Sequence, residues 1–307
     1  MLRYALTRVT GAIPTLFIVV VVAFAMVRAA PGGPFDTERS LPVEVEANIE
    51  RAYHLDEPLP QQFMRYLSGL LRGDLGPSFR YSDYTVAELV AAALPVSVKL
   101  GATAMLFALL VGIPAGMLAA LRRDTFTDRF VSGIAMTGVS IPVIVIAPLL
   151  VLVFAVLLGW LPAGWSGGHA QTRWILPVLA LALPQIAFIA RITRSSMIEV
   201  LESEFIRTAR AQGLQTGAIL VHHALKPAML PLLSYLGPAI VGIVTGAIVI
   251  EQIFSIPGLG HLFVQGALNR DYTLVLGLVI LYAALIVLFN LIVDLLYGVL
   301  DPRIRRQ

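Results

Sequence analysis

Few side chains in this sequence could do chemistry, and their spacing excludes the common nucleotide-binding arrangement. A phosphate-binding loop needs Gly-x-x-x-x-Gly-Lys followed by Ser or Thr, because backbone amides and one lysine hold the phosphates. The chain has two lysines, Lys99 and Lys226, preceded by Val98 and Leu225, so neither belongs to such a loop. We therefore predict that the chain is not an enzyme, binds no cofactor of its own and leaves any ATP hydrolysis to another chain.

Metal and hydrolase chemistry also lack the residues they need. Cysteine is absent, which excludes disulfides and thiol catalysis. No His-Glu-x-x-His sequence occurs, and the adjacent His222 and His223 are more typical of packing at a membrane edge than of a metal site. The sequence therefore predicts neither a catalytic site nor a metal site.

The composition is that of a polytopic membrane protein. Hydrophobic residues make up 58% of the 307 residues and charged residues only 13%, with a mean hydropathy of +0.83. A soluble domain carries roughly twice that share of charge. The pI near 9.3 would indicate nucleic acid only if basic residues clustered on a soluble domain, and none is present, so no nucleic-acid partner is predicted.

We predict an all-α, single transmembrane domain over 1–307. A bilayer core of about 30 Å needs about 20 apolar residues per helix. Six segments meet this requirement: 9–29, 97–120, 131–158, 174–196, 229–254 and 274–297. Arginines are concentrated in the flanks of one side, which predicts that both termini and the loop 198–228 are cytoplasmic and that a long loop, 30–96, is external. A cleaved signal peptide at the first segment is the weaker alternative, because its apolar run is too long.

Local signals add detail to this plan. Pro142 and Pro148 predict a kink in the third span. Within the external loop, a helical spacing of apolar residues over 63–71 predicts an amphipathic helix against the membrane or the bundle, which Gly73-Asp-Leu-Gly-Pro77 then breaks. Gly242 and Gly246 favour tight helix packing, with a flexible point in a pore helix as the alternative. The apolar segment 254–260 is expected to turn back against the bundle, as a gate or as a structural plug.

The segment 203–213 predicts a short helix on the cytoplasmic loop. Ser203 is expected to cap its N-terminus, Glu204 complements the helix dipole and Gly213 can take the left-handed position that ends it. A rod over Glu204–Gln212 is too short to be stable alone, so something outside the segment must hold it. An ordinary loop with one helical turn is the alternative interpretation.

Charged residues are nearly absent from the middle of the predicted spans. Proton or sodium transport needs ionisable groups near the midplane, so an ion-coupled secondary transporter is disfavoured. The charges expected at external ends are Lys99, Glu251, Arg270 and Asp271. We predict that Glu251 or Asp271 faces the translocation path or a docked partner; the alternative is that these charges pair with one another and fix the loop 255–273.

The motifs resemble those of a known family, the inner-membrane permease subunits of ATP-binding-cassette importers. Ala209 and Gly213 match the family's coupling-helix pattern Glu-Ala-Ala-x-x-x-Gly, whereas Arg207 and Thr208 depart from it. The form Arg-Thr-Ala-Arg-Ala-x-Gly-Leu is similar to that of the peptide and nickel branch. Segments 30–35, 73–76, 190–197 and 256–260 also look like this branch, and 37–42, 223–227 and 266–272 look most like its oligopeptide permeases.

The resemblance implies a permease subunit of an ATP-driven peptide importer in a bacterial inner membrane. It implies four kinds of partner: a second permease, two ATPase subunits that bind ATP and Mg, an external binding protein, and the peptide. It also implies that the ATPase-coupling helix consists of Glu204, Arg207, Thr208, Ala209, Arg210, Ala211, Gln212 and Gly213. Dipeptide, nickel or glutathione importers of the same branch are the alternatives.

Overall fold

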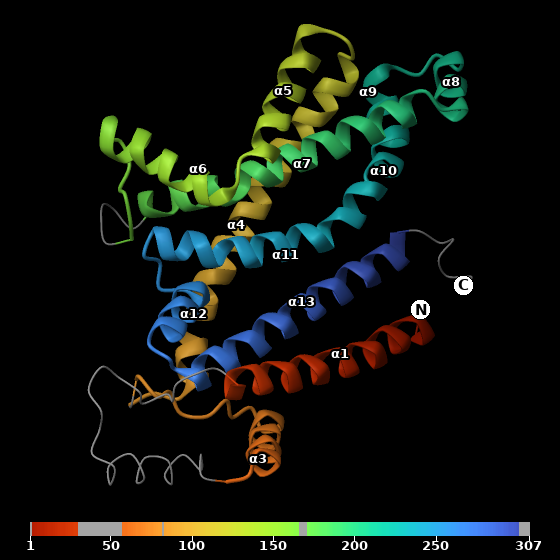
Figure 1. Cartoon of the computed structure of the whole chain (residues 1–307). Coiled ribbons are helices and arrows are strands. Elements are labelled where there is room, and N and C mark those ends of the chain that lie inside the picture. Colours follow the sequence, from red (N-terminus) through yellow and green to blue (C-terminus); the bar gives the residue numbers. More distant parts are fainter. Residues whose placement is uncertain (1, 30–56, 82, 166–170, 301–307) are drawn as a thin grey trace. The chain divides into compact units, whose positions relative to one another are not determined.

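The computed structural model of the protein describes residues 2–29, 57–81, 83–165 and 171–300, and within these residues it contains helices and no strand (Figure 1). The chain divides into two compact units. One consists of Val98–Ile256 with Met1–Leu6 and Leu288–Gln307, and the other of Thr7–Ser97 with Pro257–Val287. Helices α1, α4 and α13 contribute residues to both units, so the division does not separate the chain into two consecutive domains.

Five of the six predicted spans are confirmed as single long apolar helices. They are α1 (Leu2–Ala29), α4 (Val86–Leu121), α7 (Ile175–Leu201), α11 (Leu230–Ile253) and α13 (Tyr272–Leu300). Among the described residues, these helices alone are long and apolar enough to cross a membrane unaided. Five helices of this length and hydropathy indicate a protein that crosses the membrane several times.

The third predicted span, 131–158, is broken. Helix α5 (Phe126–Ser140) and helix α6 (Val143–Leu150), which continues into the π-helix η1 (Val151–Leu157), bend by 106° (Figure 1). The break falls at Ile141, whose backbone is extended, because the following proline disfavours helical geometry there. The kink predicted at Pro142 is confirmed, whereas Pro148 stays inside α6 and is followed by wider π-type turns.

In the first unit, α7 packs against α5, α6 and α11. It also lies very close to α4: a Cβ atom at Gly116 would be 2.4 Å from the Ala190 carbonyl oxygen. At Gly112, one turn earlier on α4, a Cβ would be 2.8 Å from the Ile189 side chain and 3.0 Å from the Ile186 carbonyl oxygen. By contrast, a Cβ at Gly246 would stand 3.4 Å from Leu181, an ordinary contact. A Cβ at Gly242 would likewise stand 3.4 Å from the Gln185 side chain, so the tight packing expected at Gly242 and Gly246 is found instead at Gly112 and Gly116 of α4.

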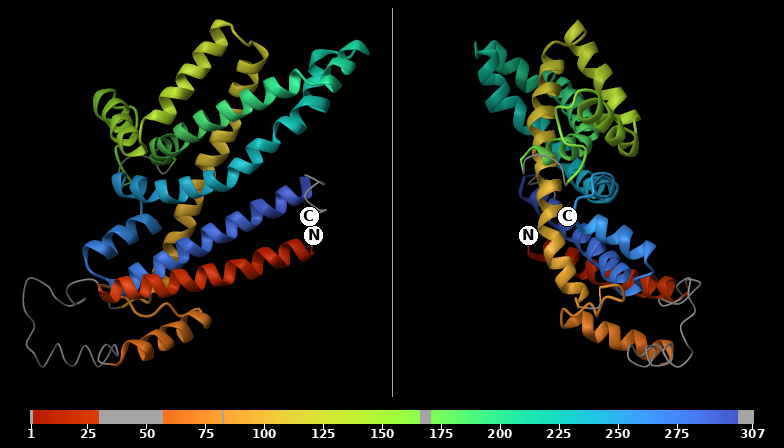
Figure 2. Two further views of the ribbon diagram at one scale, coloured as in Figure 1. Left: turned by 45° about the vertical axis from the view of Figure 1, so that its right-hand side comes forward. Right: turned by 90° about the vertical axis from the view of Figure 1, so that its left-hand side faces the viewer.

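The second unit contains α3 (Leu59–Leu71), which confirms the predicted amphipathic helix. It lies beside α1 (Figure 2). Its inner face packs against α1 and α13, with the Phe63 ring centroid 5.3 Å from that of Phe24. Gly73 and Gly76 have positive φ values of 78° and 86°, which confirms the predicted break after this helix.

The described part of the external loop is shorter than predicted, because α4 begins at Val86 and not near residue 97. Thr85 and Glu88 form a reciprocal capping box: the Glu88 amide donates to the Thr85 hydroxyl, and the Glu88 carboxylate accepts from the Thr85 amide at 2.8 Å. The sequence carries this signal as a Thr followed three residues later by a Glu, directly before an apolar run. Residues 30–56 of the predicted loop lie outside the described residues.

The segment 254–260 turns back into protein, as predicted. Phe254 and Ile256 are fully buried, and the Phe254 carbonyl accepts a hydrogen bond from the Trp165 amide at 2.9 Å. In the second unit, the Leu259 amide, at the start of α12 (Leu259–Leu268), donates to the Ser97 hydroxyl at 2.8 Å. Protein groups therefore satisfy this non-helical backbone, which a lipid environment could not do.

The close approach at Gly116 gives a direct test of this packing. We expect Gly116→Ala to destabilise the protein by about 2 kcal/mol, because the new methyl group meets backbone atoms that cannot rotate away. Gly246→Ala is the matched control and should change stability little. Thermal unfolding of the detergent-solubilised protein measures both, and equal unfolding temperatures for the two variants would contradict the observed packing.

Candidate functional site

The predicted short helix is present as α8 (Glu204–Ala211), one residue shorter than expected at its C-terminal end. Ser203 precedes it with an extended backbone, φ −70° and ψ 152°. Its hydroxyl donates to the Val200 carbonyl at 2.5 Å and makes no capping bond to α8. The predicted side-chain cap is therefore wrong: the end of α7 leaves a carbonyl acceptor within closer reach of this serine.

The C-terminal end of α8 is confirmed as a glycine-dependent stop. Gly213 has a φ of 80°, in the left-handed region. The Gly213 amide donates to the Arg210 carbonyl at 3.0 Å and the Leu214 amide donates to the Ala209 carbonyl at 3.3 Å. This pair of bonds is the Schellman arrangement, and it fixes the direction in which the chain leaves α8.

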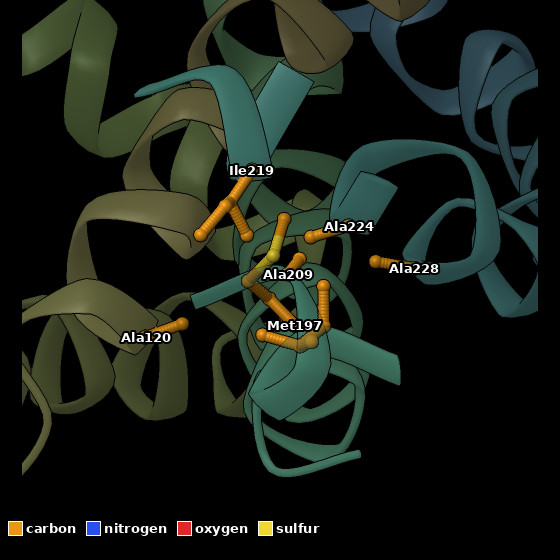
Figure 3. Close-up of a cluster of buried hydrophobic side chains, with 7 residues drawn as sticks. Ala120, Met197, Ala209, Ile219, Ala224 and Ala228 are labelled. Atoms are coloured by element: carbon orange, nitrogen blue, oxygen red, sulfur yellow. The ribbon is translucent and has the colours of Figure 1, made fainter. Parts of the chain in front are cut away.

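The inner face of α8 is anchored by its own chain. Ile206 and Ala209, three residues apart, are buried in a cluster that Figure 3 shows converging from several helices. The other members are Ala120 of α4, Met197 of α7, Ile219 of α9 (Thr216–Ile219), Ala224 of η3 (Leu220–Ala224) and Ala228 of α10 (Leu225–Ala228). The prediction that something outside the segment must hold this helix is confirmed.

The outer face of α8 is polar and exposed. Residues 204, 207, 208 and 211 follow the i, i+3, i+4, i+7 spacing of one helix face, and all four are exposed. Glu204 and Arg207 form an ion pair at 2.8 Å with both side chains mostly in solvent. Phe205 flanks this face and remains 49% exposed. The arrangement is a rigidly held surface of mixed charge with one aromatic side chain, suited to docking and not to catalysis.

Two ion pairs near α8 were not predicted from the sequence. Arg194 of α7 binds Asp128 of α5 through two contacts of 2.5 and 2.7 Å, and Asp128 is almost fully buried. Arg123, after α4, pairs with Glu202, the residue that ends α7. In the sequence, these arginines indicate only which side of the membrane their flanks face. The two pairs connect α4, α5 and α7 directly before α8 begins, and losing one partner of a buried pair costs far more than losing an exposed one.

The four charges predicted at the external mouth do not have a common environment. Lys99 lies over the Trp174 ring, 4.7 Å from its centroid, and Glu251 is fully buried near the end of α11. Arg270 takes a left-handed conformation after α12, with a φ of 56°. Lys99 and Glu251 belong to the first unit, Arg270 and Asp271 to the second.

Asp271 has a clear structural role. It is fully buried and accepts hydrogen bonds from the Ser78 hydroxyl at 2.5 Å and from the Leu274 amide at 3.1 Å. The amides of Phe79 and Arg80 also donate to it, each at 3.2 Å. The carboxylate thus caps α13 and fixes the segment 78–80. Neither Asp271 nor Glu251 is exposed in this conformation, so a role at an external mouth stays a prediction for both.

Comparison with known proteins agrees with this geometry. Residues 112–306 match the family described as binding-protein-dependent transport system inner membrane component, and residues 1–101 match its N-terminal region. The oligopeptide transport system permease protein OppB of Salmonella typhimurium is 60% identical over 306 residues, covering 99% of this chain and 100% of the relative. The dipeptide transport system permease protein DppB of Bacillus subtilis is 40% identical, covering 99% of this chain and 98% of the relative.

Among solved structures, the MetNI methionine ABC transporter in an inward-facing conformation is similar in fold. The likeness covers 69% of this chain and 96% of that chain, with a TM-score of 0.58 and 19% sequence identity. The family match extends over more than half of the chain, and the relatives align over nearly all of it. The chain therefore belongs to the inner-membrane components of binding-protein-dependent transport systems, and is a multi-pass protein of the bacterial inner membrane.

Proposed function

We propose that this chain is a transmembrane subunit of an ATP-driven oligopeptide importer and forms half of its translocation pathway. The observation that carries the proposal is α8, a short helix whose inner face is locked into the bundle and whose outer face is free to dock. The oligopeptide substrate class is supported by the 60% identity to a permease named for oligopeptide transport.

Four kinds of partner complete this proposal. A second permease of similar shape supplies the other half of the pathway, and two ATPase subunits bind ATP and Mg. An external binding protein delivers the peptide. Family membership supports such an assembly in general terms, and the absence of a phosphate-binding loop in this sequence requires a separate ATPase.

In the proposed mechanism, α8 transmits the movement of an ATPase subunit to the permease. With the loop 198–228 in the cytoplasm, an ATPase subunit contacts the exposed stripe of Glu204, Arg207, Thr208 and Ala211. Displacement of the stripe moves Ile206 and Ala209 with it, because these side chains are buried among helices that cannot be compressed. The movement thereby reaches α4, α7 and α10, and the pathway exchanges its inward-open and outward-open states.

A dipeptide importer of the same branch is the second candidate, favoured by the 40% identity to a dipeptide permease. It uses the same coupling helix, so α8 does not distinguish the two substrates. The two candidates can be distinguished by measuring uptake of labelled dipeptides and labelled pentapeptides by the assembled transporter. For an oligopeptide importer we expect pentapeptides to be taken up and to compete with dipeptides for uptake. Uptake of dipeptides alone would favour the second candidate.

Gly213 provides the first test of coupling. We expect Gly213→Val to lower peptide uptake per ATP hydrolysed by at least about tenfold, because a β-branched residue is strained at positive φ and the Schellman stop is lost. No heavy atom lies within 4 Å of the added Cβ, so the change acts through backbone conformation alone.

Gly213→Asn is the matched control, since asparagine tolerates the left-handed region. It should retain most of the coupling. Uptake and ATPase rates are measured on the same reconstituted complexes. Coupling in Gly213→Val equal to that of the unmodified chain would show that the stop at residue 213 has no part in transport.

Glu251 is the candidate for a role in the pathway. We propose that Glu251 faces the pathway in another state of the cycle, so Glu251→Gln should reduce peptide uptake severalfold in normally assembled complex. Unchanged uptake in Glu251→Gln would remove this proposed role.

Asp271 is the candidate for a structural role. We expect Asp271→Asn to lower the free energy of unfolding by about 2 kcal/mol, because the new amide group would face backbone donors. Substitution of the exposed Asp83 by Asn is the control for both variants.

A further inference from the structure

The C-terminal half of α1 borders two adjoining hollows, both with mainly apolar walls. One is a half-open cavity of 250 Å³ bordered by α1, α3, the segment 74–79 and the start of α13. The other, of 420 Å³, runs between α1 and α3 and is lined almost entirely by apolar side chains. Phe24 and Arg28 line both, so the cavity and the groove meet at these two residues. All of these residues belong to the second unit.

Among its mainly apolar walls, the cavity holds two hydroxyl groups that the described residues leave without hydrogen-bond partners. Arg28 lies 5.4 Å from the Phe24 ring centroid and forms no ion pair with any residue in the described ranges. The neighbouring Arg65, by contrast, is held by Glu57 at 2.5 Å. The Tyr66 hydroxyl and Thr273 Oγ1 are both buried, and neither has a hydrogen-bond partner within the described part of the chain. Buried polar groups without partners are unusual and costly, which indicates that something else satisfies them.

The position of this cavity restricts what that partner is. Residues Thr10–Ala29 are apolar and long enough to span a membrane, so Arg28 lies at the end of a span, at the depth of lipid headgroups. An arginine with two hydroxyl donors suits the oxygens of a phosphodiester. The adjoining groove, lined by Val21, Phe24, Ala25, Leu59 and Phe63, suits a hydrocarbon chain.

We propose that this composite site binds one glycerophospholipid, with the phosphodiester on Arg28, Tyr66 and Thr273 and an acyl chain in the groove between α1 and α3. A soluble phosphate would leave the groove empty, and a hydrocarbon without phosphate would leave the donors unsatisfied. The bound lipid joins α1, α3 and α13 within the second unit. This site is independent of the proposed coupling function.

Native mass spectrometry of the complete transporter tests the proposal with three probes: dioleoylphosphatidylglycerol, dioleoylglycerol and glycerol 3-phosphate. Only the phospholipid should bind saturably. Arg28→Gln should weaken it about tenfold, since one charge-assisted contact is lost. Arg72→Gln, an exposed arginine outside the cavity, is the matched control and should bind as the unmodified chain does.

A second variant keeps the proposal testable if Arg28→Gln fails to fold. Tyr66→Phe combined with Thr273→Val removes the two unsatisfied hydroxyls, so it should raise the unfolding temperature of the lipid-free protein while weakening phospholipid binding severalfold. A purely structural role would not produce these opposite changes. Undiminished phospholipid binding in this double variant or in Arg28→Gln overturns the proposal, as does equal binding of dioleoylglycerol or of glycerol 3-phosphate.

Discussion

Eight residues are too few to hold an α-helix in water, because nucleation of the first turn is costly and few hydrogen bonds follow it. Helix α8 therefore depends on burying Ile206 and Ala209 against α4, α7, α9, η3 and α10. Full burial of a side chain such as Ile206 contributes about 2 kcal/mol. The constraint has a functional consequence: a helix that exists only while docked on the bundle cannot move without moving the bundle.

Small side chains make the packing between α8 and the bundle rigid. Four of the seven buried residues in the cluster around α8 are alanines, and α4 meets α7 through Gly112 and Gly116. Backbones that approach this closely leave little room for independent motion, and small residues are the usual means of packing helices within membranes. The Arg194–Asp128 pair adds a polar connection between α7 and α5, and the Arg123–Glu202 pair adds one between the ends of α4 and α7. Packing and electrostatics thus connect α8 to α4, α5 and α7.

Features coded by neighbouring residues could be predicted from the sequence. The apolar spans, the amphipathic α3, the break at Pro142 and the left-handed Gly213 each follow from local composition or backbone preference. The capping box at Thr85 and Glu88 was also readable, and would have placed the start of α4 correctly. The Ser203 cap failed because the hydroxyl had a competing acceptor in the preceding helix.

Features that depend on distant partners could not be predicted in the same way. Asp271 meets Ser78 across 193 residues of sequence, and Arg194 meets Asp128 across 66. The close approach at Gly116 likewise depends on α7, which no local pattern identifies. The sequence showed that these residues are charged or small, but only the fold shows which surfaces they join.

We propose that the exposed stripe of α8 contacts an ATPase subunit while its opposite face stays inside the permease. The chain has no cysteine, so single cysteines carrying a photo-crosslinker can be placed without removing any native one. We predict that Thr208→Cys and Ala211→Cys cross-link to the ATPase in the assembled transporter. Tyr84→Cys, exposed in the predicted external loop, should not. Cross-links from residue 84 to the ATPase, or none from 208 and 211, would contradict the account.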